Sequence, residues 1–323
     1  MAASGDLGVA VLIVNYNSGK YLRRALEALS HQTLRDFRVI VVDNASSDGS
    51  EEGLEGRYSN VKLVRAGRNL GFAAGNNLAL EHAGAADWIA LLNPDAFAEP
   101  DWLENLLLAA YANPQFSFFG CRMLLADMPD VLDGTGDVYH VSGMAWRRDH
   151  GRRAERGVSK PGEIFSPCAA AALYSRAALE EVRGFDEGYF CYFEDVDLAF
   201  RLRLRGRRCR YVPDAVVHHV SSGIVGRRSD FATYHGHRNM VWTYVKNMPL
   251  GLFWLFLPLH LLANLASIAV CAARGQLGVV LRAKRDALCG LRDVMRRRRE
   301  VQAARKIGMS DLLAVMNAGL FRR

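Results

Sequence analysis

Short apolar runs that alternate with helix-like stretches constrain the fold of this chain more than any other feature. The runs cover residues 9–15, 37–43, 61–65, 88–92 and 116–122. They are continuously apolar, which is typical of strands covered on both faces. Amphipathic stretches with apolar residues at helical spacing lie between them. The pattern therefore predicts an α/β fold with a mostly parallel central sheet covered by helices.

Polar residues stand where three of these runs end. Asn15 and Asn17 follow the first run, Asp43 closes the second, and Asp95 follows the fourth. In open α/β sheets, ligands bind beyond the carboxyl ends of the strands. A single such turn would be ordinary loop chemistry, because Asn, Asp and Gly are common turn formers. Several turns on one edge instead indicate a ligand site.

A fourth turn, after the run at 61–65, opens a predicted helix. Asn69 and Gly71 stand at its start, and Asn77 lies within it. Glycine allows a ligand to approach the backbone closely, and a helix N-terminus favours anionic groups such as phosphate. We therefore expect these residues to help bind a phosphorylated ligand.

A second acidic site follows an aromatic stretch at residues 192–193. Glu194, Asp195 and Asp197 occupy the first turn of a predicted helix, where carboxylates also act as favourable partners of the helix dipole. Arg201 lies four residues after Asp197, so these two are expected to form an ion pair. Glu194 and Asp195 remain as candidates for a general base or a metal ligand. Together with Asp95 they suggest one shared cleft.

Length and charge divide the chain of 323 residues in two. We expect a catalytic domain over residues 1–247 and a helical region over 248–323. Residues 274–323 carry 13 Lys and Arg against 4 Asp and Glu, so the tail holds +9 and the rest −2 of the net +7. No nucleic-acid motif accompanies this tail, which favours an anionic membrane surface over nucleic acid. The six scattered cysteines argue against zinc or disulfides and fit a reducing cytosol.

Residues 247–273 contain no Asp, Glu, Lys or Arg. Pro258 is expected to interrupt this stretch and leave a helix over 259–273, too short for a bilayer core of about 30 Å. A basic amphipathic helix is expected next, with Leu277, Val280, Leu281, Leu288 and Leu291 on one face. We expect peripheral attachment to the inner face of the cell membrane. The alternative is a helical subdomain packed on the core or on a second copy of the chain.

The segment 144–163 is rich in Arg, Gly and Lys and is predicted to be a mobile surface loop. Its five arginines could contact an anionic acceptor, or could simply be solvated: Arg147, Arg148, Arg152, Arg153 and Arg156.

Several motifs in their order along the chain resemble those of family 2 inverting glycosyltransferases of GT-A fold. They are residues 14–17, 42–49, 69–77, 93–95, 184–186 and 193–198. Within that family the chain is most similar to bacterial rhamnosyltransferases of polysaccharide and O-antigen assembly. The resemblance spans roughly residues 9–247.

The resemblance implies a role for each matching residue. Asp43 would recognise the pyrimidine of a dTDP or UDP sugar, and Asn15, Asn17 and Asn69 would shape the nucleoside pocket. Asp95 would hold Mg²⁺ or Mn²⁺, for which one or two carboxylates suffice when phosphates supply other ligands.

The remaining roles concern catalysis. Asp195 would be the base that activates a hydroxyl of a glycan or polyprenyl-linked saccharide, and His219 matches a position that can face the metal. Pro167 and Cys168 replace a small residue of the family, which leaves one sugar contact undefined.

Two other functions remain open from the residues alone. Nucleotidyl transfer uses a related sheet, but it normally shows a glycine-rich, basic turn after the first strand, unlike Asn15 to Ser18. A catalytically silent membrane-bound scaffold would have no need of Asp43, Asp95 and Asp195.

Overall fold

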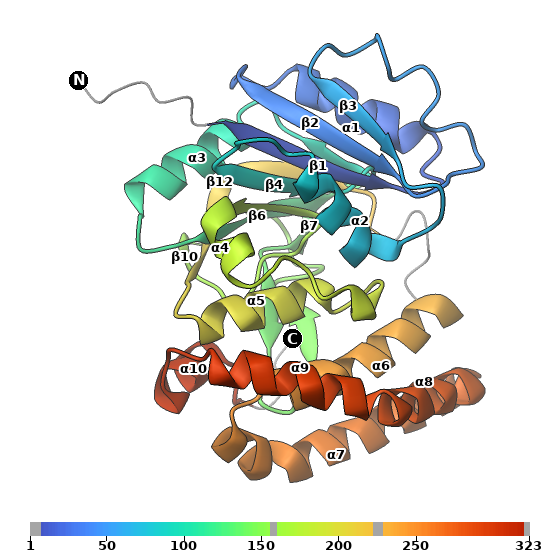
Figure 1. The fold of residues 1–323 in the computed structure, drawn as a ribbon, viewed down its shortest axis with the longest axis vertical. Coiled ribbons are helices and arrows are strands. Elements are labelled where there is room, and N and C mark those ends of the chain that lie inside the picture. The colour runs from blue at the N-terminus through green and yellow to red at the C-terminus, as the bar shows by residue number, and fades with distance from the viewer. Residues whose placement is uncertain (1–7, 156–159, 222–228, 320–323) are drawn as a thin grey trace.

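A ten-stranded mixed sheet forms the centre of the protein (Figure 1). The computed structural model describes residues 8–155, 160–221 and 229–319. The strand order is β10-β12-β6-β11-β4-β1-β2-β3, with β5 paired to β12 and β7 paired to β6, while β8 and β9 form a separate hairpin. The strands are β1 Val9–Asn15, β2 Phe37–Asp43, β3 Val61–Arg65, β4 Trp88–Leu92, β5 Ala96–Ala98, β6 Phe118–Leu125, β7 Met128–Gly134, β8 Asp137–Tyr139, β9 Ala145–Arg147, β10 Gly162–Glu163, β11 Ala171–Ser175 and β12 Cys209–His219.

Ten α-helices and one 3₁₀ helix surround the sheet in the described part of the chain. They are α1 Lys20–Ser30, α2 Gly71–Glu81, α3 Trp102–Ala112, α4 Arg176–Glu181, the 3₁₀ helix Glu187–Tyr189, α5 Glu194–Leu204, α6 Asp230–Asn247, α7 Leu250–Ala273, α8 Leu277–Cys289, α9 Leu291–Ala303 and α10 Met309–Val315. The first four predicted strands are confirmed with their expected bounds, and the fifth begins at Phe118 rather than at residue 116.

The sheet has two parallel parts, the N-terminal strands and the pair β6 and β12. β4, β1, β2 and β3 are all parallel, whereas β11 runs antiparallel to both of its neighbours, β4 and β6. In β1, Val9, Val11 and Ile13 face one apolar core, and Ala10 and Leu12 face a second core on the other side. This double burial explains why the strands read as continuous apolar runs.

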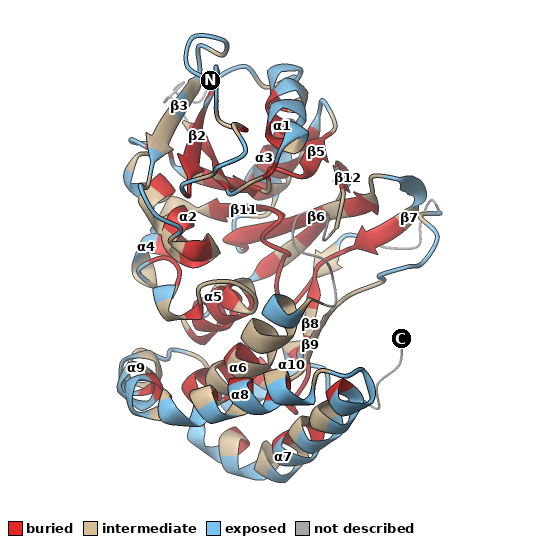
Figure 2. Cartoon of the chain, turned by 90° about the vertical axis from the view of Figure 1, so that its right-hand side faces the viewer, coloured by how far each residue is buried: buried red, intermediate tan, exposed pale blue. Residues whose placement is uncertain are grey.

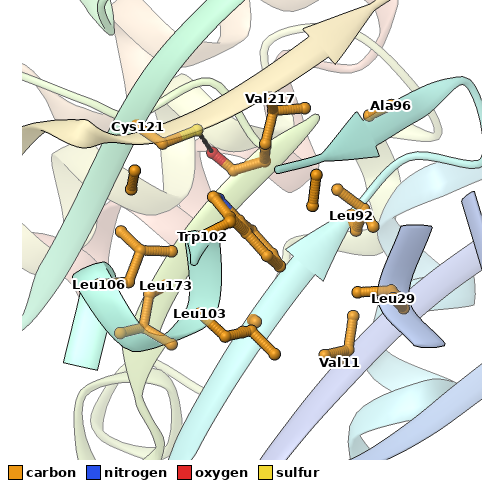
Figure 3. Close-up of a cluster of buried hydrophobic side chains, with 14 of the residues drawn as sticks. Val11, Leu29, Leu92, Ala96, Trp102, Leu103, Leu106, Cys121, Leu173 and Val217 are labelled. Atoms are coloured by element: carbon orange, nitrogen blue, oxygen red, sulfur yellow. Dashed lines mark hydrogen bonds between the residues drawn. The ribbon is translucent and has the colours of Figure 1, made fainter. Parts of the chain in front are cut away.

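Each core is closed by its own helices. α1 and α3 cover one face, where Trp102 is fully buried among side chains of the sheet (Figure 3). In the same cluster, Cys121 Sγ donates to the backbone carbonyl of Ala171, 3.3 Å away. α2, α4 and α5 cover the opposite face. α5 lies between the sheet and the layer of C-terminal helices (Figure 1).

α7 corrects one expectation, because the helix continues through Pro258 and spans 24 residues. It is about 36 Å long at 1.5 Å per residue. Pro258 cannot donate a helical backbone hydrogen bond, and the burial of Leu252, His260 and Ala263 against the protein offsets this loss. α7 is the one described helix that is long and apolar enough to cross a membrane by length and composition. The argument from length against a span is therefore wrong.

The polar stripe of α7 faces the protein. His260 stacks on Tyr244 with ring centroids 3.9 Å apart, and its Nδ1 donates to the carbonyl of Ser142 at 2.7 Å. The opposite side exposes large apolar side chains, among them Leu255, Leu262 and Leu265.

The basic region after α7 forms two helices rather than one, because Gly290 interrupts the helix between α8 and α9. A Cβ at this position would lie 2.6 Å from the ring of Trp242, so α6 can approach only a glycine here. Val280 is buried, whereas Leu277, Leu281 and Leu288 are exposed. The predicted apolar face is thus divided between the protein interior and the surface.

α6 packs on α5, α8 and α9, so it lies within the C-terminal helical layer. Residue 247, the predicted domain boundary, therefore falls inside this layer. A third apolar core, which includes Phe200 of α5 and Tyr244 of α6, joins the layer to the rest of the chain.

A buried charge cluster fixes this layer to α5. Lys246 Nζ lies 2.5 Å from Asp186 Oδ2 and 2.7 Å from Asp197 Oδ1. Arg201 Nε lies 2.8 Å from Asp197 Oδ2, which confirms the predicted ion pair. Burial raises the pKa of Asp197, but the charges of Lys246 and Arg201 outweigh burial and hold it below its usual value.

We expect Lys246→Met to destabilise the protein by about 3 kcal/mol, because it leaves Asp197 buried with less compensating charge. The free energy of unfolding is measured with urea at pH 7. Lys306→Ala removes an exposed pair with Glu181 and serves as the control, with a loss below about 1 kcal/mol. Equal losses in both variants would contradict the importance of the cluster.

Candidate functional site

A cavity of about 1240 Å³ lies beyond the carboxyl ends of β1 and β4. The predicted site residues in its lining are Asn17, Asn69, Gly71, Asp95, Glu194, Asp195 and His219. Asn15, Asp43 and Asn77 do not line it. Loops after three strands and the first turn of α5 thus converge on one space, as the sequence predicts.

Strand pairing brings Asp95 and His219 together. Asp95 precedes β5, and β5 pairs antiparallel with the end of β12, where Ala96 is opposite His219. His219 Nε2 lies 3.4 Å from Asp95 Oδ1, and its Nδ1 lies 2.9 Å from Asp133 Oδ2. All three side chains are buried.

Charges on either side determine the protonation of this group. Burial lowers the pKa of His219, but hydrogen bonds to Asp133 and Asp95 outweigh it and raise the pKa above its usual value. Burial raises the pKa of Asp133, yet the His219 hydrogen bond and the charge of Arg147 hold it well below the usual range. His219 is therefore bound between two carboxylates.

Asp195 stands in the first turn of α5, half-buried at the cavity. Its Oδ2 accepts a hydrogen bond from the backbone N–H of Ala169 at 3.2 Å, and its Oδ1 accepts from Val196 N–H at 2.8 Å. Burial raises the pKa of Asp195 despite these hydrogen bonds. A carboxylate with a raised pKa at a cavity wall has the properties of a general base.

Glu194 is more deeply buried than Asp195. Burial and the neighbouring charge of Asp195 raise the pKa of Glu194 well above its usual value. Its Oε2 has no hydrogen-bond partner within the described residues. A neutral Glu194 would leave Asp195 as the charged member of the pair.

Arg147 corrects the prediction of a mobile loop over residues 144–163. It lies in β9, paired with β8, and its guanidinium is part of the cavity lining. Nη1 lies 2.5 Å from Asp133 Oδ2, Nη2 donates to Cys168 Sγ at 2.7 Å, and Nε lies 3.8 Å from Asp137 Oδ1. Arg156 lies outside the described residues. Pairing with buried acids, rather than solvation, accounts for Arg147.

Asp137, on the other side of Arg147, is close to Asp195. Burial and then the charge of Asp195 raise the pKa of Asp137 to about 7. Ligand atoms of Asp137, Cys168 and Asp195 lie within 4.8 Å of one another, a spacing that could hold a metal ion. The guanidinium of Arg147 bonded to Cys168 disfavours a cation there, so Asp95 and His219 are the better metal candidates.

Asn15 and Asp43 organise the turn after β2. Asn15 Nδ2 lies 2.9 Å from Asp43 Oδ1 and 2.9 Å from Ser50 Oγ, and Asp43 Oδ2 accepts from the N–H of Ser46 at 3.1 Å. Asn15 is 0% exposed and Asp43 is 4% exposed. Both side chains lie behind the lining and stabilise the loop that carries it.

The N-terminus of α2 differs from expectation. Its first backbone N–H groups, those of Phe72 and Ala73, donate to the carbonyl of Phe190 at 2.7 and 3.2 Å. The N–H of Gly71 donates to Asn69 Oδ1 at 2.9 Å. These groups already have partners, so the helix dipole does not offer the free phosphate site that the sequence suggests. Gly71 instead allows close contact with Phe190, which a Cβ would meet at 2.6 Å.

Asn77 also has a structural partner. Its Oδ1 accepts from the N–H of Phe185 at 2.9 Å, and its Nδ2 donates to the Phe185 carbonyl at 3.0 Å. Asn77 thus holds the turn at residues 184–186 against α2. Asn17, in contrast, reaches the cavity, and its Oδ1 accepts from Ser47 N–H at 2.8 Å.

Two residues of the site were not found from the sequence, Asp133 and Asp137, and the sequence indicates Arg147 only as one of five loop arginines that could contact an anionic acceptor. The signal available was the acid–glycine alternation at residues 133–137, which joins the end of β7 to the start of β8. Their convergence depends on the β8-β9 hairpin and on the pairing of β7 with β6, which no local pattern specifies.

The site can perform acid–base chemistry next to a charge-stabilising centre. The Asp95–His219 pair and the carboxylate of Asp195 line the same cavity, and Arg147 adds positive charge between them. Such a set suits transfer between an anionic leaving group and a hydroxyl nucleophile.

Comparison with known proteins identifies the family of the chain. The sequence model described as glycosyl transferase family 2 matches residues 10–183. The chain is 34% identical over 252 residues to the N-acetylglucosaminyl-diphospho-decaprenol L-rhamnosyltransferase of Mycobacterium tuberculosis, covering 70% of this chain and 80% of the relative. It is 29% identical over 221 residues to rhamnosyltransferase WbbL of Escherichia coli, covering 64% of this chain and 80% of the relative.

A solved structure supports the fold. The mannosyltransferase PcManGT of Pyrobaculum calidifontis, in complex with GDP-Man and Mn²⁺, aligns with a TM-score of 0.56 at 20% identity, covering 92% of this chain and 85% of that structure. The GT-A fold is therefore confirmed. The family model and the relatives, rather than the fold, favour glycosyl transfer over nucleotidyl transfer and a silent scaffold. With a family match over more than half of its length and rhamnosyltransferases among its relatives, the chain belongs to glycosyl transferase family 2 and is a glycosyltransferase.

Proposed function

We propose that the protein is an inverting, metal-assisted rhamnosyltransferase that moves L-rhamnose from dTDP-rhamnose to a hydroxyl of a lipid-linked saccharide in cell-surface polysaccharide synthesis. The observation that carries the proposal is the convergence of Asp95, His219 and Asp195 on one cavity. The choice of rhamnose is supported by the names of the two relatives, which are both rhamnosyltransferases.

The donor's nucleoside would lie at the ends of β1 and β3. Asn17 and Asn69 line the cavity there and can contact it directly. Asn15 and Asp43 would act through the turn that they order, because their oxygen and nitrogen atoms are already hydrogen-bonded to it. Pocket shape and not charge would then determine the preference for a pyrimidine nucleotide.

The transfer is a single displacement with Asp195 as the base. Asp195 removes the proton from the acceptor hydroxyl, and the hydroxyl oxygen attacks the anomeric carbon from the face opposite the diphosphate. The new C–O bond forms as the bond to the diphosphate oxygen breaks, and the nucleoside diphosphate leaves with the electron pair. Inversion at the anomeric carbon follows from one displacement.

Asp95 and His219 would hold Mg²⁺ or Mn²⁺. Asp133 supports this assignment. Its hydrogen bond to Nδ1 orients the His219 ring with Nε2 towards Asp95, as carboxylates do for histidine ligands in many metal sites. When bound, the ion would neutralise charge on the departing diphosphate. Asp133 would position His219, and Arg147, which itself lines the cavity, would position Asp133 through their ion pair.

The acceptor and the cell membrane would meet at the C-terminal helices. The Mycobacterium tuberculosis relative acts, by its name, on a decaprenol-linked sugar. Pale blue, exposed residues mark the outer sides of α7 and α8 (Figure 2), and these include Trp254, Leu255, Leu262 and Leu265. Arg274 is also exposed and suits anionic lipid head groups. We therefore propose peripheral attachment to the cytoplasmic face of the membrane, with the apolar side of α7 in the interface.

Asp195→Asn is expected to lower kcat by about 10²- to 10⁴-fold and to leave donor affinity nearly unchanged. Steady-state kinetics and donor titration measure both quantities. Asp101→Asn, on the exposed end of α3, is the control. An equal loss of donor affinity and turnover would contradict the assignment.

The pH profile is expected to follow the raised pKa of Asp195. The base must be deprotonated to act, so kcat/KM falls as the pH drops through this raised value. The acidic limb should therefore lie above the ordinary aspartate pKa of about 3.9. A limb at or below that value in pH–rate measurements would contradict the proposed environment.

Metal removal is expected to abolish most transfer, because the diphosphate would leave without its counter-charge. Activity is measured after EDTA treatment and after addition of Mg²⁺ or Mn²⁺. His219→Gln should raise the metal concentration for half-maximal activity, whereas His218→Gln, which pairs with Glu99, should not. Full activity in EDTA would refute metal dependence.

The triple variant Leu255→Ser, Leu262→Ser and Leu265→Ser is expected to weaken vesicle binding more than tenfold through lost apolar burial. Sedimentation with phosphatidylglycerol–phosphatidylethanolamine vesicles measures it. Leu108→Ser, at an equally exposed leucine of α3, is the control. Unchanged sedimentation of the triple variant would exclude this face as the attachment site.

A further inference from the structure

Three aromatic side chains form part of the cavity lining beside the proposed base. Phe190, Tyr192 and Phe231, here called the aromatic wall, all line the cavity. The Phe231 ring lies 6.1 Å from that of Phe190 and 6.2 Å from that of Tyr192, at steep angles to both. The wall joins the loop before α5 to the first turn of α6.

The loop holds a strained conformation. Phe190, Tyr192 and Phe193 have φ angles of 64°, 66° and 66°, which bulky L-residues rarely adopt. Such conformations persist where the surrounding structure imposes them, and they concentrate at functional sites. Here the side-chain amide of Asn239 donates to three backbone carbonyls of the loop at 2.7–3.0 Å. The Arg238 guanidinium donates to the carbonyls of Gly188 and Tyr189 at 3.2 and 2.9 Å.

The rings are not used to fill a core. Phe231 is 37% exposed, and Phe190 and Tyr192 are only half-buried, whereas Phe118 and Phe200 of the cores are fully buried. Aromatic rings held by α6 at the edge of a cavity leave part of their surface for a ligand. The strained backbone keeps them there rather than letting them collapse inwards.

The position of the aromatic wall favours the acceptor sugar, rather than the pyrimidine of the donor, as its ligand. Tyr192 precedes Asp195 by three residues, and the base must contact the acceptor hydroxyl. The predicted nucleoside contacts Asn17 and Asn69 come instead from the ends of β1 and β3. Phe231 of the wall lies in α6, which packs on α8 and α9 of the helix layer that would face the lipid.

We propose that the aromatic wall binds the sugar ring of the acceptor, a pyranose that stacks its apolar C–H face on Phe231 and Tyr192. The C–H groups of such a face carry partial positive charge and are attracted to the negative face of an aromatic ring. The stacked sugar presents its hydroxyl to Asp195. This inference rests on the proposed function, because it assigns the acceptor of that reaction.

The test is the KM for a soluble acceptor, an N-acetylglucosaminyl diphosphate ester with a short alkyl chain. Phe231→Leu keeps apolar volume but removes the ring face, so its acceptor KM should rise roughly three- to tenfold. Phe231→Tyr and Tyr192→Phe keep the ring and should retain the KM of the unchanged protein. Donor hydrolysis without acceptor is measured in every variant, and the rise in acceptor KM of Phe231→Leu should exceed any change in it.

Two controls separate stacking from other effects. Tyr111→Leu removes an exposed ring on α3 and should change nothing. Thermal midpoints of all variants report whether the loop remains folded, and an altered midpoint in Phe231→Leu moves the test to Tyr192→Leu. An acceptor KM unchanged in both leucine variants would overturn the proposal.

A lipid contact is the competing explanation for the wall. The alkyl diphosphate without sugar is added as an inhibitor, and its inhibition constant should be the same in Phe231→Leu and in the unchanged protein. An equal loss of affinity for this sugar-free compound would assign the wall to the lipid chain and overturn the proposal. If the unchanged protein neither hydrolyses nor transfers from any nucleotide sugar, the proposed function itself fails.

Discussion

The ion pairs and hydrogen bonds of the buried Asp197 carboxylate are the contacts on which the cavity and the C-terminal helices depend. Its two oxygens lie 2.7–3.2 Å from donor atoms of Arg201, Lys246, Asn247 and Tyr189. A fully buried charge is tolerated only when it is paired and hydrogen-bonded in this way. Because Asp197 is two residues from Asp195, the same contacts fix the turn that carries the proposed base. They also join α5 to α6, and so join the site to the C-terminal helices.

Acidic and basic side chains alternate along the other wall of the cavity. Asp95, His219, Asp133 and Arg147 follow one another in hydrogen-bond or ion-pair contact, and Asp137 continues the series towards Asp195. Each group stabilises its neighbour where water is largely excluded. Arg147 thus lies between Asp133 and Asp137 and balances the charge of both. This arrangement explains how so many acidic groups share one cavity.

Expectations from local pattern succeeded where burial alone decides the structure. Residues 9–15 are apolar on both sides, and they form a strand covered on both faces. Expectations failed where a distant partner decides. Pro258 does not end α7. Gly290, which Trp242 approaches closely, separates α8 from α9. Arg147 lies in a strand and pairs with Asp133, although a loop was expected there. The free phosphate site at α2 is absent because Phe190, over a hundred residues away, supplies a carbonyl to it.

The sequence by itself determined five strands, β1 to β4 and β6, their order of appearance, the polar turns at the ends of β1, β2 and β4, and the acidic start of α5. These follow from side-chain periodicity and turn chemistry, which are local properties. Only the tertiary structure decided which polar groups line the cavity and which stabilise it from behind, as Asn15, Asp43 and Asn77 do. The physical reason is that a polar side chain binds whichever partner the packed chain brings within about 3 Å, and that distance depends on strand pairing and helix packing between segments far apart in sequence.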